Sequence, residues 1–420
     1  MNPGAFFIHR PVATTLLTLA ITLSGLLGFS LMPVAPMPQI DFPTIVVIAR
    51  LPGASPETMA TTVATPLERQ LGRIAGIEEM SSASSIGFTR IIIQFDVNRN
   101  IDGAARDVQA AINAARSLLP ANMPTNPIYR KANPVDSPVL VISLTSDTLT
   151  PGQMYDAAST VLAQKLSQVL GVGQVELGGS ALPAVRVELN LDAVNKYGLG
   201  LEQIRQTLAG ANANRPKGFL EDGEIRWLIH ANDQAKTADA FRDLVIAFVE
   251  DSPVYLRDIA EVRDSVQDVR NAGTANGKPA VLITLRRQPG ANVIETVDRV
   301  KALLPELKAS VPGGVDLTVE LDQSETIRAS LHEVELTIVI AIVLVLGVVL
   351  LFLRNARATL IPAGALPVSL IGTFGALYLM GYTIDTLSPM PITIATGFVG
   401  DDVIVVLKNI TPHLKQGSPP

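Results

Sequence analysis

Two adjacent acidic residues interrupt a long apolar segment near the end of the chain. Asp401 and Asp402 are the only charged residues between Met390 and Leu407. A carboxylate in the middle of a membrane costs about 2.5–3.5 kcal/mol even on a permissive insertion scale. Burial and mutual repulsion favour the protonated form of at least one carboxyl group, which is what a proton relay requires. If the segment lies in the membrane interface instead, both carboxylates are solvated.

Other chemistry finds less support in the sequence. An intramembrane aspartyl protease needs two carboxylates from different helices at one water, whereas Asp401 and Asp402 are neighbours and Asp385 is predicted in a loop. There is no cysteine, and the four histidines form no close ligand pair, so thiol catalysis is excluded and a zinc site is disfavoured. We therefore expect no enzyme activity, no metal and no cofactor.

Composition indicates a membrane protein. Of 420 residues, 48% are hydrophobic and only 17% are charged, and the mean hydropathy is +0.33. The net charge of −6 gives no basic surface for nucleic acid. At this length, a single compact domain is not expected.

Four apolar segments approach the roughly 20 residues that a membrane helix needs. We expect spans at 11–32, 335–353, 359–382 and 390–408. A signal peptide is the alternative for the first, but its apolar core is usually only about 7–15 residues long. If the chain crosses the membrane four times, the basic residues that flank the spans all fall on one side. Cytoplasmic loops carry such an excess of Lys and Arg. This topology puts residues 1–10 and 409–420 in the cytoplasm, and residues 33–334 outside it.

The segment outside the cytoplasm alternates strand and helix patterns, and its first unit appears twice. Strands are predicted at Thr44–Ala49, Arg90–Phe95 and Val139–Ser143, and a strand–helix–strand unit at Val281–Val319. The spacing of Leu67, Leu71, Gly76 and Ile77 recurs at Leu162, Leu166, Gly171 and Val172. Two βαβ halves around an insert predict ferredoxin-like subdomains. The insert, about residues 181–272, is long enough to be a folded module. The predicted fold class is an α+β membrane protein.

The chain closely resembles the resistance–nodulation–division multidrug transporters. The stretches that carry the resemblance are 7–14, FIHRPVAT; 38–43, PQIDFP; 51–57, LPGASPE; 65–68, TPLE; 103–110, GAARDVQA; and 367–373, PVSLIGT. The similarity covers essentially the whole chain, and we expect it to correspond to the N-terminal half of such a transporter.

The resemblance implies a proton-driven efflux pump in the bacterial inner membrane. Porter subdomains would occupy 43–135, and 136–180 with 273–330; a docking domain would occupy 181–272. Asp401 and Asp402 match the family's proton-binding aspartates. The implied partners are a homologous subunit in a homotrimer or heterotrimer, a periplasmic adaptor and an outer-membrane channel. Amphiphilic small molecules would be the substrates, and membrane lipid would surround the spans.

Some positions depart from the family pattern. Pro138 and Gly178 stand near the positions of the aromatic drug pocket, so an aromatic pocket is not expected. The family's relay lysine lies in the second half, beyond residue 420. The last span also carries Pro389, Pro391, Gly400 and Lys408 at unusual positions. These departures leave an alternative open, namely a truncated, non-transporting fragment or an assembly module.

Overall fold

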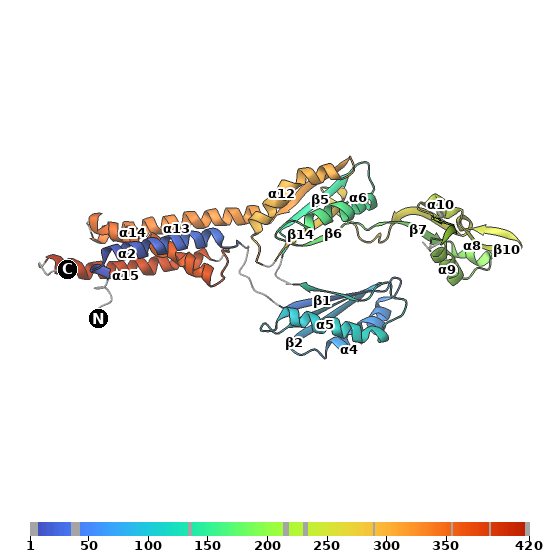
Figure 1. Cartoon of the computed structure of the whole chain (residues 1–420), viewed down its shortest axis with the longest axis horizontal. Coiled ribbons are helices and arrows are strands. Elements are labelled where there is room, and N and C mark those ends of the chain that lie inside the picture. The colour runs from blue at the N-terminus through green and yellow to red at the C-terminus, as the bar shows by residue number, and fades with distance from the viewer. Residues whose placement is uncertain are drawn as a thin grey trace. The chain divides into compact units, whose positions relative to one another are not determined.

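The computed structural model of the chain describes residues 7–34, 43–132, 137–212, 218–229, 234–288, 290–353, 356–385 and 388–415. They divide into two compact units. The first comprises Met1–Pro138, Arg286–Ile294 and Gln323–Pro420; the second comprises Val139–Leu285 and Glu295–Asp322. Figure 1 labels the elements of both.

Long helices form the apolar part of the first unit and lie side by side in Figure 1. They are α2 (Pro11–Leu31), α13 (Gln323–Leu353), α14 (Ala356–Leu379) and α15 (Pro389–Lys415). Among the described residues, three segments are long and apolar enough to cross a membrane: Pro11–Leu31, Gln323–Leu351 and Thr359–Leu379. The apolar run of α15, Met390–Val399, is shorter. The fourth span therefore stays a prediction.

The ends of these helices differ from the predicted boundaries for local reasons. α13 begins at Gln323, well before residue 335, because the polar residues between them include no glycine or proline to stop a helix. α14 ends at Leu379 rather than at residue 382. There Gly381 has φ +77°, and the amide of Tyr382 donates to the carbonyl of Leu377 at 3.0 Å, closing a Schellman motif. α15 continues past residue 408 to Lys415.

Glycines let α2 and α14 pack backbone against backbone. A Cβ placed on Gly25 would lie 1.9 Å from the carbonyl oxygen of Ile371, and one on Gly28 would lie 2.8 Å from that of Phe374. Beside them, the rings of Phe29 and Phe374 meet edge to face with centroids 5.1 Å apart. Helices in lipid associate through close approach at small residues. Apolar side chains gain little free energy there, because they leave lipid, which is itself apolar, for the helix interface.

The first unit also contains a four-stranded antiparallel sheet in the order β2-β3-β1-β4. Its strands are β1 (Thr44–Arg50), β2 (Ile77–Ser85), β3 (Phe88–Phe95) and β4 (Ile128–Ala132). The helices are α3 (Pro56–Thr58), continued through a π turn into α4 (Thr65–Leu71), and α5 (Ile101–Ala115). The core between sheet and helices includes Ile45, Leu67, Ile91 and Phe95, all fully buried. Two of the predicted strands, Thr44–Ala49 and Arg90–Phe95, are thus confirmed.

The second unit repeats this plan. Strand β6 (Val172–Gly178) pairs with β14 (Lys278–Arg287), which lies next to β5 (Leu140–Ser146) and then β15 (Val315–Asp322). The strand order is that of the first sheet, and both follow the split βαβ pattern. The helices of this sheet are α6 (Pro151–Ala157), α7 (Ala163–Ser167) and α12 (Val293–Ser310).

The predicted internal repeat is confirmed at its defining positions. Leu67 on α4 and Leu162, at the end of the π turn between α6 and α7, are both fully buried. Gly76 and Gly171 have φ values of +79° and +96°, and each stands directly before a strand. A positive φ is adopted readily only by glycine, so the same turn residue is needed twice.

The predicted insert follows β6 and precedes the hairpin of β13 (Thr274–Ala275) and β14. A two-stranded ribbon, β7 (Pro183–Leu189) with β12 (Ala260–Val266), leads to it. Its helices are α8 (Leu191–Lys196), α9 (Leu201–Ala211), α10 (Ala238–Arg242) and α11 (Leu256–Ile259). Two hairpins complete it, β8 (Phe219–Asp222) with β9 (Ile225–Leu228), and β10 (Val245–Val249) with β11 (Ser252–Tyr255). A separate core that includes Val194, Ile204 and Leu256 makes the insert a folded module.

Substitution of Gly25 tests the packing of α2 on α14. Gly25→Ala places a methyl group against backbone atoms that have no room to move. We therefore expect the free energy of unfolding to fall by about 2 kcal/mol or more. The measurement is the unfolding midpoint of the purified chain in detergent, followed by circular dichroism. Gly347→Ala on α13 is the matched control, since its Cβ would meet no atom within 4 Å. Equal midpoints for the two variants would contradict the packing argument.

Candidate functional site

Asp401 and Asp402 both lie well inside α15. Pro389 and Pro391 occupy the first turn, where a missing amide costs no intrahelical hydrogen bond. At a rise of about 1.5 Å per residue, Asp401 lies about 18 Å along the helix from its start. The helix therefore places both carboxylates near the middle of its length.

One face of α15 packs against α13 and α14. Thr396 on this face is fully buried, and its hydroxyl donates to the carbonyl of Ile392 at 2.8 Å. With 3.6 residues per turn, Asp401 lies about 140° around the helix from Thr396, and Asp402 lies about 120° away in the other sense. Both carboxylates thus stand on the side opposite the packed face.

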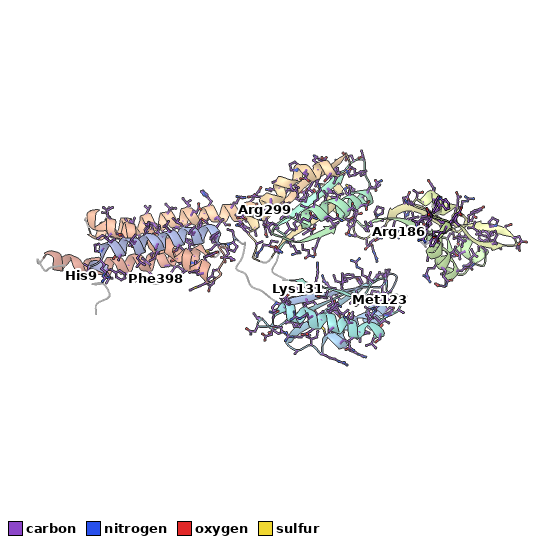
Figure 2. The ribbon with its side chains drawn as sticks, in the orientation of Figure 1. His9, Met123, Lys131, Arg186, Arg299 and Phe398 are labelled. Carbon is purple, nitrogen blue, oxygen red and sulfur yellow. The ribbon has the colours of Figure 1, made fainter. Side chains whose placement is uncertain are left out.

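The side that carries the aspartates is a continuous exposed stripe. Ile394, Phe398 and Val405 are 51%, 70% and 61% exposed, and Asp401 and Asp402 between them are exposed as well. Phe398 is labelled in Figure 2. Two ionisable groups facing lipid would be costly, so such residues face protein or a water-filled cavity. Asp401 and Asp402 are thus two exposed acidic groups within an otherwise apolar stripe.

Asp385 is not part of this site, although it is buried. Its Oδ1 accepts from the amide of Ser388 at 2.8 Å and from the Ser388 hydroxyl at 2.9 Å, while its own amide donates to that hydroxyl at 3.1 Å. The reciprocal bonds fix the turn that leads into α15. Asp385 thus lies a long way along the helix from Asp401, and the two carboxylates do not meet as an aspartyl protease requires.

The turn at Asp385 is tied to the end of α2. The amide of Ile384 donates to the carbonyl of Pro33 at 3.0 Å, and Ile384 and Val34 form a parallel β-bridge. The amide of Val293, the first residue of α12, donates to the carbonyl of Val34 at 3.2 Å. Sequence reasoning missed this junction; the only local signal was the Asp-x-x-Ser-Pro spacing before α15.

The predicted pocket positions lie in different units. Pro138 is half-buried shortly before β5, in the first unit. Gly178 ends β6 in the second, and a Cβ added to it would meet no atom within 4 Å. Neither position carries an aromatic group. Within the described ranges, no three His, Asp or Glu side chains gather as a metal site would require.

Comparisons with known proteins agree on one family. The family model described as the AcrB/AcrD/AcrF family matches residues 4–420. The chain is 60% identical over 416 residues, 99% of its length, to the multidrug resistance protein MdtC of Yersinia enterocolitica serotype O:8 / biotype 1B. MdtC proteins of Yersinia pseudotuberculosis serotype O:1b and Yersinia pestis bv. Antiqua match at the same identity over the same length. The chain spans 41% of the length of these relatives.

Substitution of Asp385 tests its role in the turn before α15. Asp385→Ala removes the acceptor for two hydrogen bonds. We therefore expect the free energy of unfolding to fall by about 1–2 kcal/mol. Asp385→Asn keeps an acceptor oxygen and should cost distinctly less. Chemical unfolding of the two purified variants measures the difference. Equal losses would mean that the charge of Asp385, rather than its hydrogen bonds, stabilises the structure.

Proposed function

The chain belongs to the AcrB/AcrD/AcrF family, and from this premise we propose that it is part of a proton-driven multidrug efflux transporter. Four spans anchor it in the bacterial inner membrane, with residues 33–334 in the periplasm. The two sheets act as porter subdomains and the insert acts as a docking domain. It works with a homologous subunit in a trimer, a periplasmic adaptor and an outer-membrane channel, and exports amphiphilic compounds.

The observation that carries the proposal is the exposed stripe with Asp401 and Asp402 on α15. A helix that only anchors the chain would present apolar side chains there, because two carboxylates make insertion harder. A surface formed by groups outside the described residues covers the stripe and supplies a positive charge. Protonation of one aspartate then breaks its interaction with that charge. Asp401 and Asp402 are the residues that take up and release the proton.

In this proposal, the hydrogen bonds near the start of α15 couple proton uptake to a movement of the backbone. Protonation changes which position of α15 has the lowest free energy, since a neutral carboxyl group no longer needs its cationic partner. The turn at Asp385 moves with the helix, and Ile384 carries the displacement to Pro33 and Val34. Val34 accepts the amide of Val293, where α12 begins. Proton uptake thereby changes the position of Val293, the first residue of α12.

The two proposed substrate positions lie in different units, and neither carries an aromatic side chain. Gly178 leaves space above the last residue of β6, and Pro138 precedes β5. A substrate at either position would contact backbone or a small side chain rather than stack on a ring. We therefore expect broad, weak selection by shape and amphiphilicity at these two positions.

The β8–β9 hairpin supports a partner subunit. Leu220, Trp227 and Leu228 on its strands are 62%, 49% and 82% exposed. An isolated two-stranded hairpin is at best marginally stable in water. Exposed apolar side chains on such a hairpin mark a protein interface, and a second subunit in the trimer is the occupant that this proposal assigns.

The alternative function, a non-transporting fragment or assembly module, is not favoured. It rested on departures in the last span, yet the family match extends through residues 4–420 and includes that span. Pro389 and Pro391 fall in the first turn of α15, where they leave the helix intact.

Neutralising the proposed relay tests the function. Asp401→Asn and Asp402→Asn fix each site in a protonated-like state, so each should abolish drug resistance in cells that carry the complete transporter assembly. The measurement is growth of a pump-deleted strain at graded drug concentrations. Glu57→Gln, an exposed acid at the start of α3, is the control and should keep full resistance. Full resistance in both aspartate variants, at normal protein level, would overturn the relay assignment.

The hairpin prediction concerns assembly alone. Trp227→Ser combined with Leu228→Ser removes apolar contact area from the proposed interface, so trimers should give way to smaller species. Native mass spectrometry of the complete transporter in detergent measures the change. Leu191→Ser is the matched control, because Leu191 is a 60% exposed apolar residue of the insert outside the hairpin. An unchanged trimer in the double variant would place the subunit interface elsewhere.

A further inference from the structure

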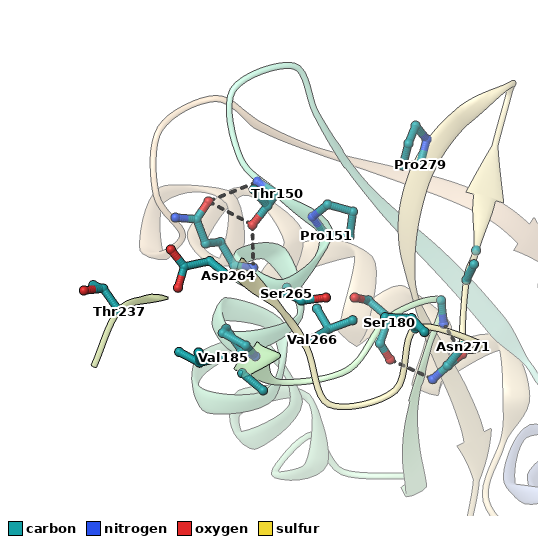
Figure 3. Close-up of a pocket in the computed structure, with 18 of the residues that line it drawn as sticks. Thr150, Pro151, Ser180, Val185, Thr237, Asp264, Ser265, Val266, Asn271 and Pro279 are labelled. Carbon is teal, nitrogen blue, oxygen red and sulfur yellow. Dashed lines mark hydrogen bonds between the residues drawn. The ribbon is translucent and has the colours of Figure 1, made fainter. Parts of the chain in front are cut away.

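A cavity of about 770 Å³ lies in the second unit, where the insert joins the second sheet (Figure 3). It is bounded by the N-terminus of α6, the end of the β7–β12 ribbon and the segment before α10. The volume is within the range of small-molecule sites, about 300–1,000 Å³. The cavity has no part in the proton relay or at the proposed substrate positions.

Close backbone packing holds the floor of this cavity in shape. The two connections to the insert cross at Gly179 and Gly273, where a Cβ on Gly273 would lie 2.6 Å from the Cα of Gly179. Asn271 donates from Nδ2 to the carbonyl of Ser180 at 2.7 Å and accepts the amide of Gly179 at 3.1 Å, as the dashed lines in Figure 3 show. The cavity is therefore formed in advance rather than opened by a ligand.

The wall next to this floor is apolar. Its apolar side chains, none of which offers a hydrogen-bonding group, are Pro151, Pro183, Val185, Val266, Val269 and Pro279. Val266 also fixes the ribbon against α6, because a Cβ on Gly152 would lie 2.8 Å from a Val266 methyl carbon. Such a wall suits a ring or a short aliphatic body.

Opposite charges share the other end of the cavity. Asp264 is held in place because its Oδ1 accepts the amide of Ala238 at 2.9 Å. Lys236 stands two residues before Ala238 and lines the same cavity. Among the described residues, neither Asp264 nor Lys236 forms an ion pair, with each other or with any third group. The ammonium group and the second carboxylate oxygen are both available to a ligand.

We infer that this cavity binds a zwitterionic amphiphile, whose ammonium group meets Asp264 and whose carboxylate meets Lys236 while its apolar body lies on the proline and valine wall. A purely cationic ligand would place its charge near Lys236, and a purely anionic one would place its charge near Asp264. Each arrangement adds a like-charge contact that a zwitterion avoids. The site goes beyond the proposed function and does not depend on transport.

Direct binding to the purified full-length chain in detergent tests the inference. The probe is Nε-dansyl-lysine, which carries an ammonium and a carboxylate at one end and a fluorescent ring system at the other. We expect saturable binding, at least about fivefold tighter than that of dansyl cadaverine, which lacks the carboxylate, or of dansyl-6-aminohexanoate, which lacks the ammonium. Fivefold corresponds to about 1 kcal/mol, the size of one exposed charge pair.

Variants locate the binding. Asp264→Asn and Lys236→Gln should each weaken dansyl-lysine binding by at least about fivefold. Val269→Trp should abolish binding by filling the cavity, with an unchanged circular dichroism melting curve as proof of folding. Glu261→Gln, on β12 outside the cavity lining, is the matched control and should bind normally. Equal affinity for the three dansyl compounds, or unchanged affinity in Asp264→Asn and Val269→Trp, would overturn the inference whatever the outcome of the transport assay.

Discussion

The proposed relay depends on one constraint, the free-energy cost of a carboxylate in hydrocarbon. Thr396 and Ile392 show which side of the helix is packed, and Asp401 and Asp402 stand on the other. A charged group on a side of α15 that faced lipid would cost about as much free energy as several apolar side chains contribute when they insert into a membrane. In the proposed fourth span, the side that carries the aspartates would therefore need a polar cover. The proposed proton chemistry and the need for a further protein surface both follow from this constraint.

Backbone contacts hold α2 against α14 and join the end of α2 to the segment before α15. Gly25 and Gly28 bring α2 into backbone contact with α14, so α2 has little freedom to slide. Pro33 and Val34 continue from α2 as a short extended segment between Ile384 and Val293. Backbone hydrogen bonds of this kind do not depend on side-chain rotamers. In the proposed mechanism, these hydrogen bonds would carry a change in the position of α15 to Pro33, Val34 and Val293.

The two sheets show how one fold accommodates an inserted module. The two sheets share one strand order, and their first helical segments end in the same glycine turn. Only the second sheet carries an insert, and its two connections cross where glycine is required on both sides. An insertion at a sheet edge leaves the core of the sheet undisturbed, because Leu140, Ile142 and Ile283 stay fully buried. The insert has a core of its own and a cavity at its base.

The sequence by itself determined the features that depend on neighbouring residues. Apolar runs located the long helices, the repeated Leu67 and Leu162 spacing located two βαβ units, and the motifs identified the family correctly. Glycine turns and strand alternation are local because backbone sterics act over a few residues. The tertiary structure alone decided which side of α15 packs, that Ile384 bonds to Pro33, that Gly25 meets Ile371, and that Lys236 shares a cavity with Asp264. These features join residues far apart in the chain, and their geometry is set by the packing of whole elements, which no local pattern encodes.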